Sequence, residues 1–382
     1  MNSSSHQTLF IMAGGVALAA LLLSLAVPSR TTNSLKQLHV VFRHGERTPA
    51  STYPNDPYIN EKFLPYGWGH LTKVGKMNPY KQGQWMRDTY GDFIGAYSTD
   101  TVEVHSTEVY RAQMTAGAFC AGLFPPTDDQ IWNKDLLWQP VPLNMQPIQH
   151  DRLLLTRGCP KFNQLLSEVL ESKEVKDSIL KNKELYDYLT EKSGTNVRNP
   201  YDVEDIYSTL KAEEGLNLKL PEWTKSVYPS KMEKESAKTF TLNTYKDDLI
   251  RLKGGPLLKK ILNDMQIKIE GKDDHKLKIY SGHDATVANL LRALGTWEEQ
   301  MPAYNAMAIF ELHQGDSDFL LKVKLRNSTM QDPYDQKIPG CPDPCTLSKV
   351  RELMAMRLPD DLDKECQVTE GSFEVMPDAV QP

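Results

Sequence analysis

The chain has 382 residues, enough for one large domain with an elaborated insertion or for two domains. Its composition is that of a globular protein, with 40% hydrophobic and 25% charged residues. The 44 basic residues are outnumbered by 50 acidic ones, which argues against nucleic acid as a partner because such binding needs a basic face. Any anion must therefore be bound by a local cluster of cations.

The N-terminal segment from Leu9 to Val27 is apolar and uncharged, and its length lies between a signal-peptide core and a membrane span. We predict that residues 1–26 form a signal peptide, cleaved after Ala26, or an uncleaved signal anchor. Either alternative exports the rest of the chain, to a secreted or lysosomal or other lumenal location. Membrane contact is expected only if the segment is retained. In such a compartment the sequon at Asn327 predicts a glycan.

The five cysteines fit an oxidising compartment, because they allow two disulfides and one leftover thiol. Cys341 and Cys345 flank two prolines in a tight loop, where a local bridge can form. Zinc is the alternative for this pair, but no His or second Cys pair lies close by, and we expect no metal. Cys120 lies in an apolar helical pattern and is expected to be a buried free thiol.

The first half of the chain alternates strands with helices. A short β-branched strand, LHVVF, ends abruptly at Arg43, and the Pro-rich stretch from Ala50 to Tyr66 is expected to be a loop. Leu71–Tyr90 has a helical pattern that we expect Asn78-Pro79 to interrupt. A strand is predicted over Thr101–His105 and a helix over Val109–Leu123.

The second half begins with a helical excursion. Asp135–Leu155 is expected to be an extended connector, and residues 160–265 are charged and helix-prone. The remaining predicted elements are a strand at Lys276–Tyr280, a helix at Asp284–Leu294 closed by Gly295, paired strands at Tyr304–Leu312 and Phe319–Leu325, and a final helix at Thr346–Arg357.

This order predicts an α/β fold with a mixed central sheet, helices on both faces and an inserted, mostly helical cap domain. The expected division is a core of residues 35–134 and 266–366, a cap of residues 135–265 and a C-terminal tail of residues 367–382. In such sheets ligands bind outside the carboxyl ends of the strands. Three distant segments therefore become one candidate site: RHGER, HSTEVYR and SGHD.

Cations in these segments are suited to a phosphate group. Arg43, Arg47 and Arg111 offer planar forks that match phosphate oxygens, and His283 adds a further donor. Two of these residues could instead have a structural role that involves no phosphate. Arg111 can turn outward as a surface residue, and His283 can serve only to orient its neighbour.

The same segments supply a nucleophile and an acid. The neutral ring of His44 can attack phosphorus and form a phosphohistidine that water later hydrolyses. Asp284 can protonate the leaving oxygen, although a helix cap is its alternative role. If activity needs protonated Asp284, an acidic optimum follows, limited at lower pH by protonation of His44.

The stretches RHGERTP, STEVYRAQMTA and SGHDATVANLL resemble the histidine acid phosphatases, especially the secreted animal enzymes of the prostatic and insect venom type. The resemblance implies a phosphomonoesterase without cofactor or metal, with His44 as nucleophile and Asp284 as proton donor. It implies phosphate ligands at Arg43, Arg47, Arg111 and His283. It also implies bridges Cys159–Cys366 and Cys341–Cys345, and it favours a homodimer.

Departures from the family pattern bear on substrate preference, for His105 and Glu108, and on the stability of the cap domain, for a missing disulfide. His105 and Glu108 stand where the prostatic type often has Arg and Asp, and a third bridge of that type has no cysteines here. The alternatives are a phytase-like inositol phosphate phosphatase on the same scaffold and a non-catalytic secreted protein that binds a phosphate ligand. The second would be signalled by loss of His44 or Asp284, and both are present.

Overall fold

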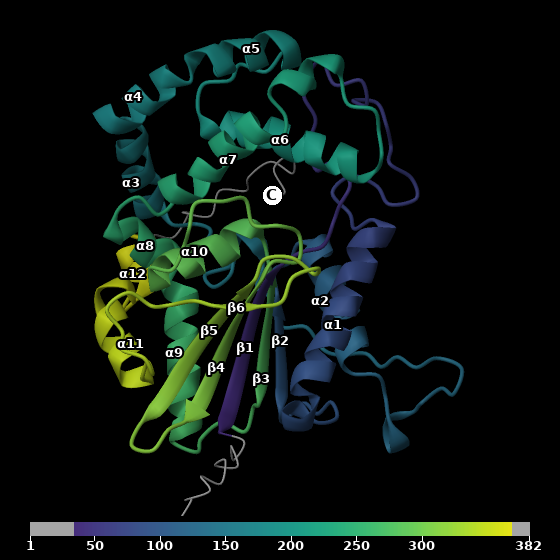
Figure 1. Ribbon diagram of the computed structural model, residues 1–382, viewed down its shortest axis with the longest axis vertical. Helices are drawn as coiled ribbons and strands as arrows, with labels where there is room; N and C mark the ends of the chain where they lie inside the picture. Colours follow the sequence, from purple (N-terminus) through teal and green to yellow (C-terminus); the bar gives the residue numbers. More distant parts are fainter. Residues whose placement is uncertain (1–33, 369–382) are drawn as a thin grey trace, which may run out of the picture. The chain divides into compact units, whose positions relative to one another are not determined.

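The computed structural model describes residues 34–368, and the described residues from Leu35 onward form one compact unit. Its centre is a six-stranded sheet in the order β2-β3-β1-β4-β5-β6 (Figure 1). The strands are β1 (Leu35–Arg43), β2 (Val102–Ser106), β3 (Leu277–Gly282), β4 (Met307–Gln314), β5 (Phe319–Arg326) and β6 (Tyr334–Asp335). β1, β2 and β3 are parallel, while β4, β5 and β6 add antiparallel neighbours. The predicted mixed sheet is confirmed.

The helices fall into a set beside the sheet and a set beyond its strand ends. Those beside it are α1 (Lys73–Ile94), α2 (Tyr110–Leu123), α9 (Gly255–Ile269), α10 (Asp284–Leu294) and α11 (Leu347–Met354). The others are α3 (Pro160–Leu170), α4 (Lys173–Lys181), α5 (Lys183–Ser193), α6 (Pro200–Gly215), α7 (Ser230–Leu242) and α8 (Asp247–Lys253). In Figure 1, α1 and α2 cover one face of the sheet, and α9, α10 and α11 lie at the other.

Alternate side chains of the strands build two hydrophobic cores. Val40, Phe42 and Ile279 pack in the core shared with α1 and α2, whereas Val41 and Tyr280 pack in the core shared with α9 and α10. Successive residues of a strand point to opposite faces, so a sheet covered on both faces needs apolar residues at nearly every position. This explains why β1 is continuously apolar from Val40 to Phe42, just before the strand ends at Arg43.

The predicted interruption at Asn78-Pro79 is wrong, because α1 runs through Pro79 without a break. Proline removes one intrahelical hydrogen bond. Packing against α2 maintains the helix: a Cβ at Gly83 would lie 2.0 Å from the carbonyl oxygen of Phe119, so the two backbones are in close contact. Tertiary contact thus outweighs the local preference.

The helices from α3 to α8 contain cores of their own, one of which includes Tyr186, Leu189, Val203 and Leu210. In Figure 1, α6 and α7 lie beyond the carboxyl end of β1, while α9 runs alongside the sheet. The division into core and cap at residues 135 and 265 stays a prediction. What matters for the site is that α6 lies beyond the carboxyl ends of the strands (Figure 1).

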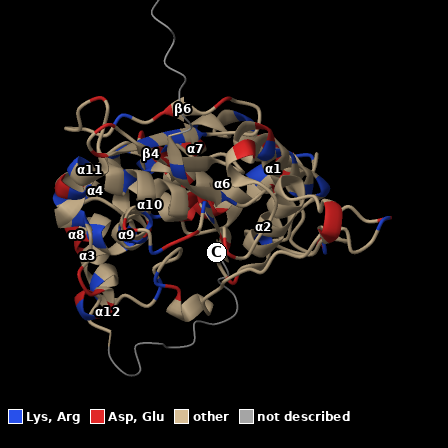
Figure 2. Cartoon of the chain, turned by 90° about the horizontal axis from the view of Figure 1, so that it is seen from below, with Lys and Arg blue, Asp and Glu red and all other residues tan. Residues whose placement is uncertain are grey.

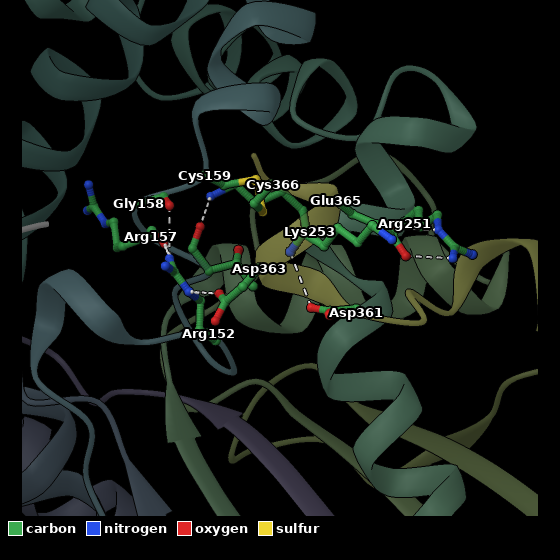
Figure 3. The surroundings of a disulfide bond; sticks show 12 residues. Arg152, Arg157, Gly158, Cys159, Arg251, Lys253, Asp361, Asp363, Glu365 and Cys366 are labelled. Atoms are coloured by element: carbon green, nitrogen blue, oxygen red, sulfur yellow. Dashed lines mark hydrogen bonds and ion pairs between the residues drawn. A yellow bond between two sulfur atoms is a disulfide. The ribbon is translucent and has the colours of Figure 1, made fainter. Parts of the chain in front are cut away.

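Two disulfides are present in the structure, Cys159–Cys366 and Cys341–Cys345. The first joins the start of α3 to the C-terminal helix α12 (Leu362–Glu365), beside an ion pair of 2.7 Å between Arg152 and Asp363 (Figure 3). The expected final helix over Thr346–Arg357 is α11 (Leu347–Met354), which continues as a 3-10 helix over Ala355–Arg357 before α12 begins. Cys120 is free and buried.

Lys and Arg residues are interspersed with Asp and Glu residues along the chain in the view of Figure 2. Within residues 34–368, no helix has both the length and the apolar character needed to cross a membrane. The predicted signal segment lies outside the described residues.

Candidate active site

The carboxyl ends of three parallel strands meet at one level. Arg43 is the register partner of Gly282, and Ser106 pairs with Ser281. His44, His283 and the segment leading to α2 therefore leave the sheet side by side. All six predicted site residues come together here, and the rings of His44 and His283 are 5.4 Å apart.

His44 is held in one tautomer. The Nε of Arg111 donates to its Nε2 at 3.0 Å, and its Nδ1 lies 2.9 Å from the carbonyl oxygen of Gly45. Arginine has no acceptor and a carbonyl has no donor, so Nδ1 carries the proton and Nε2 carries the lone pair. Burial and the positive charges of Arg111 and Arg43 hold the pKa of His44 well below its usual range. The ring is therefore neutral.

The turn after β1 is fixed to α2, which places Arg111. The backbone N–H of Gly45 donates to Thr115 Oγ1 at 3.0 Å, and that hydroxyl donates to the carbonyl oxygen of Arg111 at 2.8 Å. A side chain at Gly45 is impossible without rearrangement, because its Cβ would lie 2.2 Å from the carbonyl oxygen of Gly75. The glycine of the RHG sequence thus allows α1, α2 and β1 to meet.

The arginines are buried but incompletely paired. Arg43, Arg47 and Arg111 are each at most 8% exposed. Arg43 pairs with Asp284 at 2.9 Å, donates to the carbonyl of Pro302 and lies over the ring of Tyr304. The Nε of Arg43 and the Nε of Arg47 have no hydrogen-bond partner among the described residues. Buried donors of this kind are costly, and an anion would satisfy them.

Arg111 carries no directly paired carboxylate among the described residues. Burial and the charge of Arg47 lower its pKa to about 9. Even this lowered value keeps the guanidinium positive at neutral and acidic pH. The repulsion between the arginines is a second sign that the cluster is built to receive negative charge.

His283 is neutral and oriented by Thr107. Its Nε2 lies 3.1 Å from Thr107 Oγ1, and its backbone N–H donates to Thr286 Oγ1 at 3.0 Å at the start of α10. Burial and the charge of Arg111 lower its pKa to about 3. A neutral imidazole with one N–H can donate to a ligand without adding to the charge.

Asp284 is the first residue of α10 and remains 22% exposed. Burial tends to raise its pKa, but the positive charge of Arg43 dominates and holds it below the usual value for aspartate. Its Oδ1 also accepts from the N–H of Ala285 at 2.7 Å. The free site therefore contains an ionised Asp284.

Two further residues, Thr107 and Tyr304, contact this cluster, and a third, Glu204, influences it electrostatically; none of the three was predicted from the sequence. Thr107 lies inside the HSTEVYR segment, so its position was a usable signal. Tyr304 comes from the segment before β4, and Glu204 from α6. The positions of these two residues depend on the tertiary path of the chain, which no local sequence pattern predicts.

His105 and Glu108, the positions that depart from the family pattern, lie elsewhere. His105 pairs with Glu103 at 3.0 Å and stacks on Tyr280, and it lines a cavity of about 310 Å³ together with Arg152 and Lys260. Glu108 accepts from the backbone of Ile148 at 2.7 Å. Neither contacts the arginine cluster in any hydrogen bond or ion pair found among the described residues.

Comparison with known proteins finds relatives that match most of the chain. The family model of the histidine phosphatase superfamily (branch 2) matches residues 34–326. Prostatic acid phosphatase from Rattus norvegicus is 37% identical over 91% of this chain and 93% of its own length. Venom acid phosphatase from Apis mellifera is 35% identical over 87% of each chain, and human lysosomal acid phosphatase is 33% identical over 90% of this chain and 83% of its own.

Solved structures show the same fold at lower identity. The phytase of Citrobacter braakii aligns with a TM-score of 0.60 and 18% identity, covering 88% of this chain and all of its own. The Klebsiella phytase aligns with a TM-score of 0.62 and 15% identity over 91% of this chain and 99% of its own. On the family match and on the identity with its acid phosphatase relatives, the chain belongs to the histidine phosphatase superfamily, branch 2.

Proposed function

We propose that the chain is an acid phosphatase that hydrolyses phosphate monoesters through a phosphohistidine at His44, without a metal. The observation that carries this is the state of His44: a buried, neutral ring whose Nε2 lone pair faces a cluster of arginines. A nucleophile inside a cationic cluster is the arrangement that phosphoryl transfer needs.

In the first step, Nε2 of His44 forms a bond to phosphorus while the bond from phosphorus to the ester oxygen breaks. The leaving oxygen takes a proton from Asp284. In the second step, water loses a proton to Asp284 and its oxygen attacks phosphorus. The bond to Nε2 then breaks and inorganic phosphate leaves.

The unpaired guanidinium nitrogens support the assignment of phosphate ligands. Arg43 and Arg47 each have a buried Nε that pairs with no residue of the described range 34–368, and Arg111 needs only to turn its fork from Nε2 of His44 to a phosphate oxygen. His283 would donate a further hydrogen bond. Charge-assisted, bidentate contacts of this kind are the strongest available to a phosphate group.

Asp284 must gain a proton before it can act as an acid. In the free site Arg43 keeps it ionised, but a bound phosphate brings negative charge and competes for Arg43. Both effects raise the pKa of the carboxyl. Activity is therefore expected to be greatest at acidic pH, where the complex of enzyme and substrate retains this proton.

The location proposed is secreted or lysosomal, and the names of the prostatic, venom and lysosomal relatives support an exported enzyme. Two disulfides suit an oxidising compartment. A glycan at Asn327 and a homodimer belong to the same proposal. The membrane-anchored alternative depends on retention of the N-terminal segment.

The phytase alternative is supported by a likeness of fold alone, whereas the acid phosphatases share more than 30% identity with this chain. A panel of phosphoprotein, lysophospholipid, nucleotide and phytate substrates would identify the preferred class. Which of these is the physiological substrate depends on the residues of α6 and of the loop over Ala50–Tyr66 that approach the site.

The test is turnover of p-nitrophenyl phosphate by the full chain from acidic to alkaline pH, with EDTA present. We expect hydrolysis with an acidic optimum that the chelator leaves unchanged. Inactivity at every pH, or activity only after a metal is added, would overturn the proposal.

A further inference from the structure

The cavity that His105 lines has no part in the proposed phosphatase mechanism. Its volume is about 310 Å³, at the lower end of the range in which proteins bind small organic molecules. Its walls come from the end of β2, from the connector before α3, from the first half of α9, and from α12 with the segment before it. None of the described residues that line it is one of the six residues of the phosphate site. A ligand bound here would therefore be separate from the phosphate group.

Part of the lining is apolar. It consists of four side chains from three segments of the chain: Leu153, Pro256, Pro359 and Leu362. Pro256 and Pro359 are buried, and the two leucines are half-buried. An aliphatic chain that fills the cavity would remove this apolar surface, and its own, from water. This part of the cavity suits a hydrocarbon tail.

Much of the remaining lining is basic. It contains Arg152, Lys259 and Lys260, and among the described residues no Asp or Glu lines the cavity. Two of these cations have carboxylate partners that do not line it. The Nε of Arg152 donates to Asp363 Oδ1 at 2.7 Å, and the Nζ of Lys260 donates to Asp264 Oδ2 at 2.9 Å. The charges of these two cations are thus balanced within the protein.

Lys259 has no such partner. Its Nζ donates to the carbonyl oxygens of Pro359 at 2.6 Å and of Asp360 at 2.9 Å, but it forms no ion pair with any residue from 34 to 368. An ammonium group has three donors, so these two bonds leave one N–H for a ligand. The side chain is half-buried, and a cation that is partly removed from water is stabilised by a nearby anion. Lys259 therefore supplies one donor and one unbalanced positive charge.

The walls that carry these groups are joined to one another. The bonds of Lys259 connect α9 to the segment before α12, and the disulfide Cys159–Cys366 connects α12 to the start of α3 (Figure 3). Arg152 adds a link within the connector, because its Nη1 donates to the carbonyl oxygen of Gly158 at 2.9 Å. Binding to a preformed site costs less conformational entropy than binding that orders the site. The cavity thus needs little rearrangement to accept a ligand.

We propose that this cavity is a second binding site, which takes a small aliphatic carboxylate whose head group pairs with Lys259 and whose tail packs against Leu153 and Leu362. One unbalanced cation matches one negative charge, so a carboxylate fits better than a doubly charged phosphate monoester. The carboxylate accepts the remaining N–H of Lys259 in a charge-assisted hydrogen bond. The proposal does not depend on the phosphatase function, because it uses no residue of the phosphate site.

The first test compares three ligands by calorimetry on the full wild-type chain at pH 6. Octanoate has the head group and the tail, 1-octanol has the tail without the charge, and octylamine has the opposite charge. One octanoate should bind per chain, at least about 10-fold more tightly than 1-octanol, as expected from one hydrogen bond to a charged group. Octylamine should bind more weakly than either. Equal affinity for octanoate and 1-octanol, or no saturable binding of octanoate, would overturn the proposal.

Competition distinguishes the cavity from the phosphate site. At equal ionic strength, saturating inorganic phosphate should leave the affinity for octanoate unchanged, because the two sites share no residue. Loss of octanoate binding in phosphate would place the carboxylate among the arginines and would contradict the proposal. A chain that binds octanoate but does not hydrolyse p-nitrophenyl phosphate would contradict the phosphatase function alone.

Lys259→Met removes the ammonium group and keeps an apolar side chain. The affinity for octanoate should fall about 10-fold, while that for 1-octanol stays the same. Lys268→Met is the matched control, since Lys268 lies on the same helix and its Nζ also donates to a backbone carbonyl, that of Asp273, at 2.9 Å. Lys268 does not line the cavity, so this variant should bind octanoate as the wild type does. Equal losses in the two variants, or no loss in Lys259→Met, would refute the assignment of the head group.

A milder variant avoids any loss of the contacts of Lys259. Gln146 lines the cavity and is exposed, and its Oε1 accepts from the backbone N–H of Arg152 at 3.0 Å. Gln146→Glu keeps this acceptor and adds a negative charge to the lining. Octanoate should then bind about 5-fold more weakly, as expected for one like charge near the solvent, and 1-octanol equally well. An unchanged affinity for octanoate would show that the carboxylate binds outside this cavity.

Discussion

Arg111 donates a hydrogen bond from Nε to Nε2 of His44 at 3.0 Å. Because arginine only donates, this contact requires a lone pair on Nε2, and the Gly45 carbonyl beside Nδ1 requires the proton on the other nitrogen. The free structure thus holds the nucleophile in its reactive tautomer and covers the reactive atom with a cation. The same cation is placed to meet the phosphate that replaces it.

The first prediction concerns the nucleophile. His44→Ala should lower kcat for p-nitrophenyl phosphate by several orders of magnitude, because the covalent route is lost. His105→Asn is the control, since His105 pairs with Glu103 away from the arginines, and it should keep activity close to that of the wild type. Full activity of His44→Ala would place the nucleophile elsewhere.

The second prediction concerns the acidic limb of the pH profile. Positive charge on Arg111 lowers the pKa of His44, so Arg111→Met should raise it. His44 attacks only when unprotonated, that is, above its pKa. The acidic limb of kcat/KM should therefore move to higher pH in the variant, in addition to weaker phosphate binding. A limb that stays in place would show that Arg111 does not set the protonation of His44.

The third prediction concerns the proton donor. Asp284→Asn should reduce hydrolysis of alkyl phosphates more than that of aryl phosphates, because aryl leaving groups need less proton donation. The comparison is the ratio of kcat/KM values for an alkyl and an aryl ester, in the variant and in the wild type. Equal losses on both substrates would indicate that Asp284 only positions Arg43.

The strand ends were predictable because one physical rule joins them. RHGER, HSTEVYR and SGHD each follow an apolar run, and parallel strands deliver their carboxyl ends to a common edge. Tyr304 and Glu204 were not predictable, because their positions depend on how α6 and the segment before β4 approach that edge. Pro79 is the opposite case. Proline is expected to interrupt a helix, but the packing of α1 on α2 keeps α1 continuous through Pro79.

The fourth prediction links a buried histidine to stability. Burial lowers the pKa of His39 from 6.5 to about 3, and its Nε2 is paired with Gln37 Oε1 at 3.0 Å. Between these two values the unfolded chain binds a proton that the folded chain does not, so stability falls as pH falls below 6.5. From neutrality to pH 5 this one group should cost about 2 kcal/mol of the free energy of unfolding.

Denaturant unfolding of the wild type and of His39→Gln at pH 7 and pH 5 measures this contribution. Other acid-sensitive groups are common to both proteins, so the difference between the two pH dependences isolates His39. The variant should lose less stability on acidification than the wild type. An identical loss would mean that His39 is protonated in the folded state.

The central claim is that the phosphoryl group passes through His44, and a trapped intermediate tests it most directly. The wild type is mixed with substrate at acidic pH, quenched in alkali, in which phosphohistidine survives, and digested for mass spectrometry. We predict a phosphoryl group on the peptide that contains His44, located on that ring and absent from His44→Ala. A phosphoryl group on another residue, or a burst of product without any phosphoenzyme, would contradict the account.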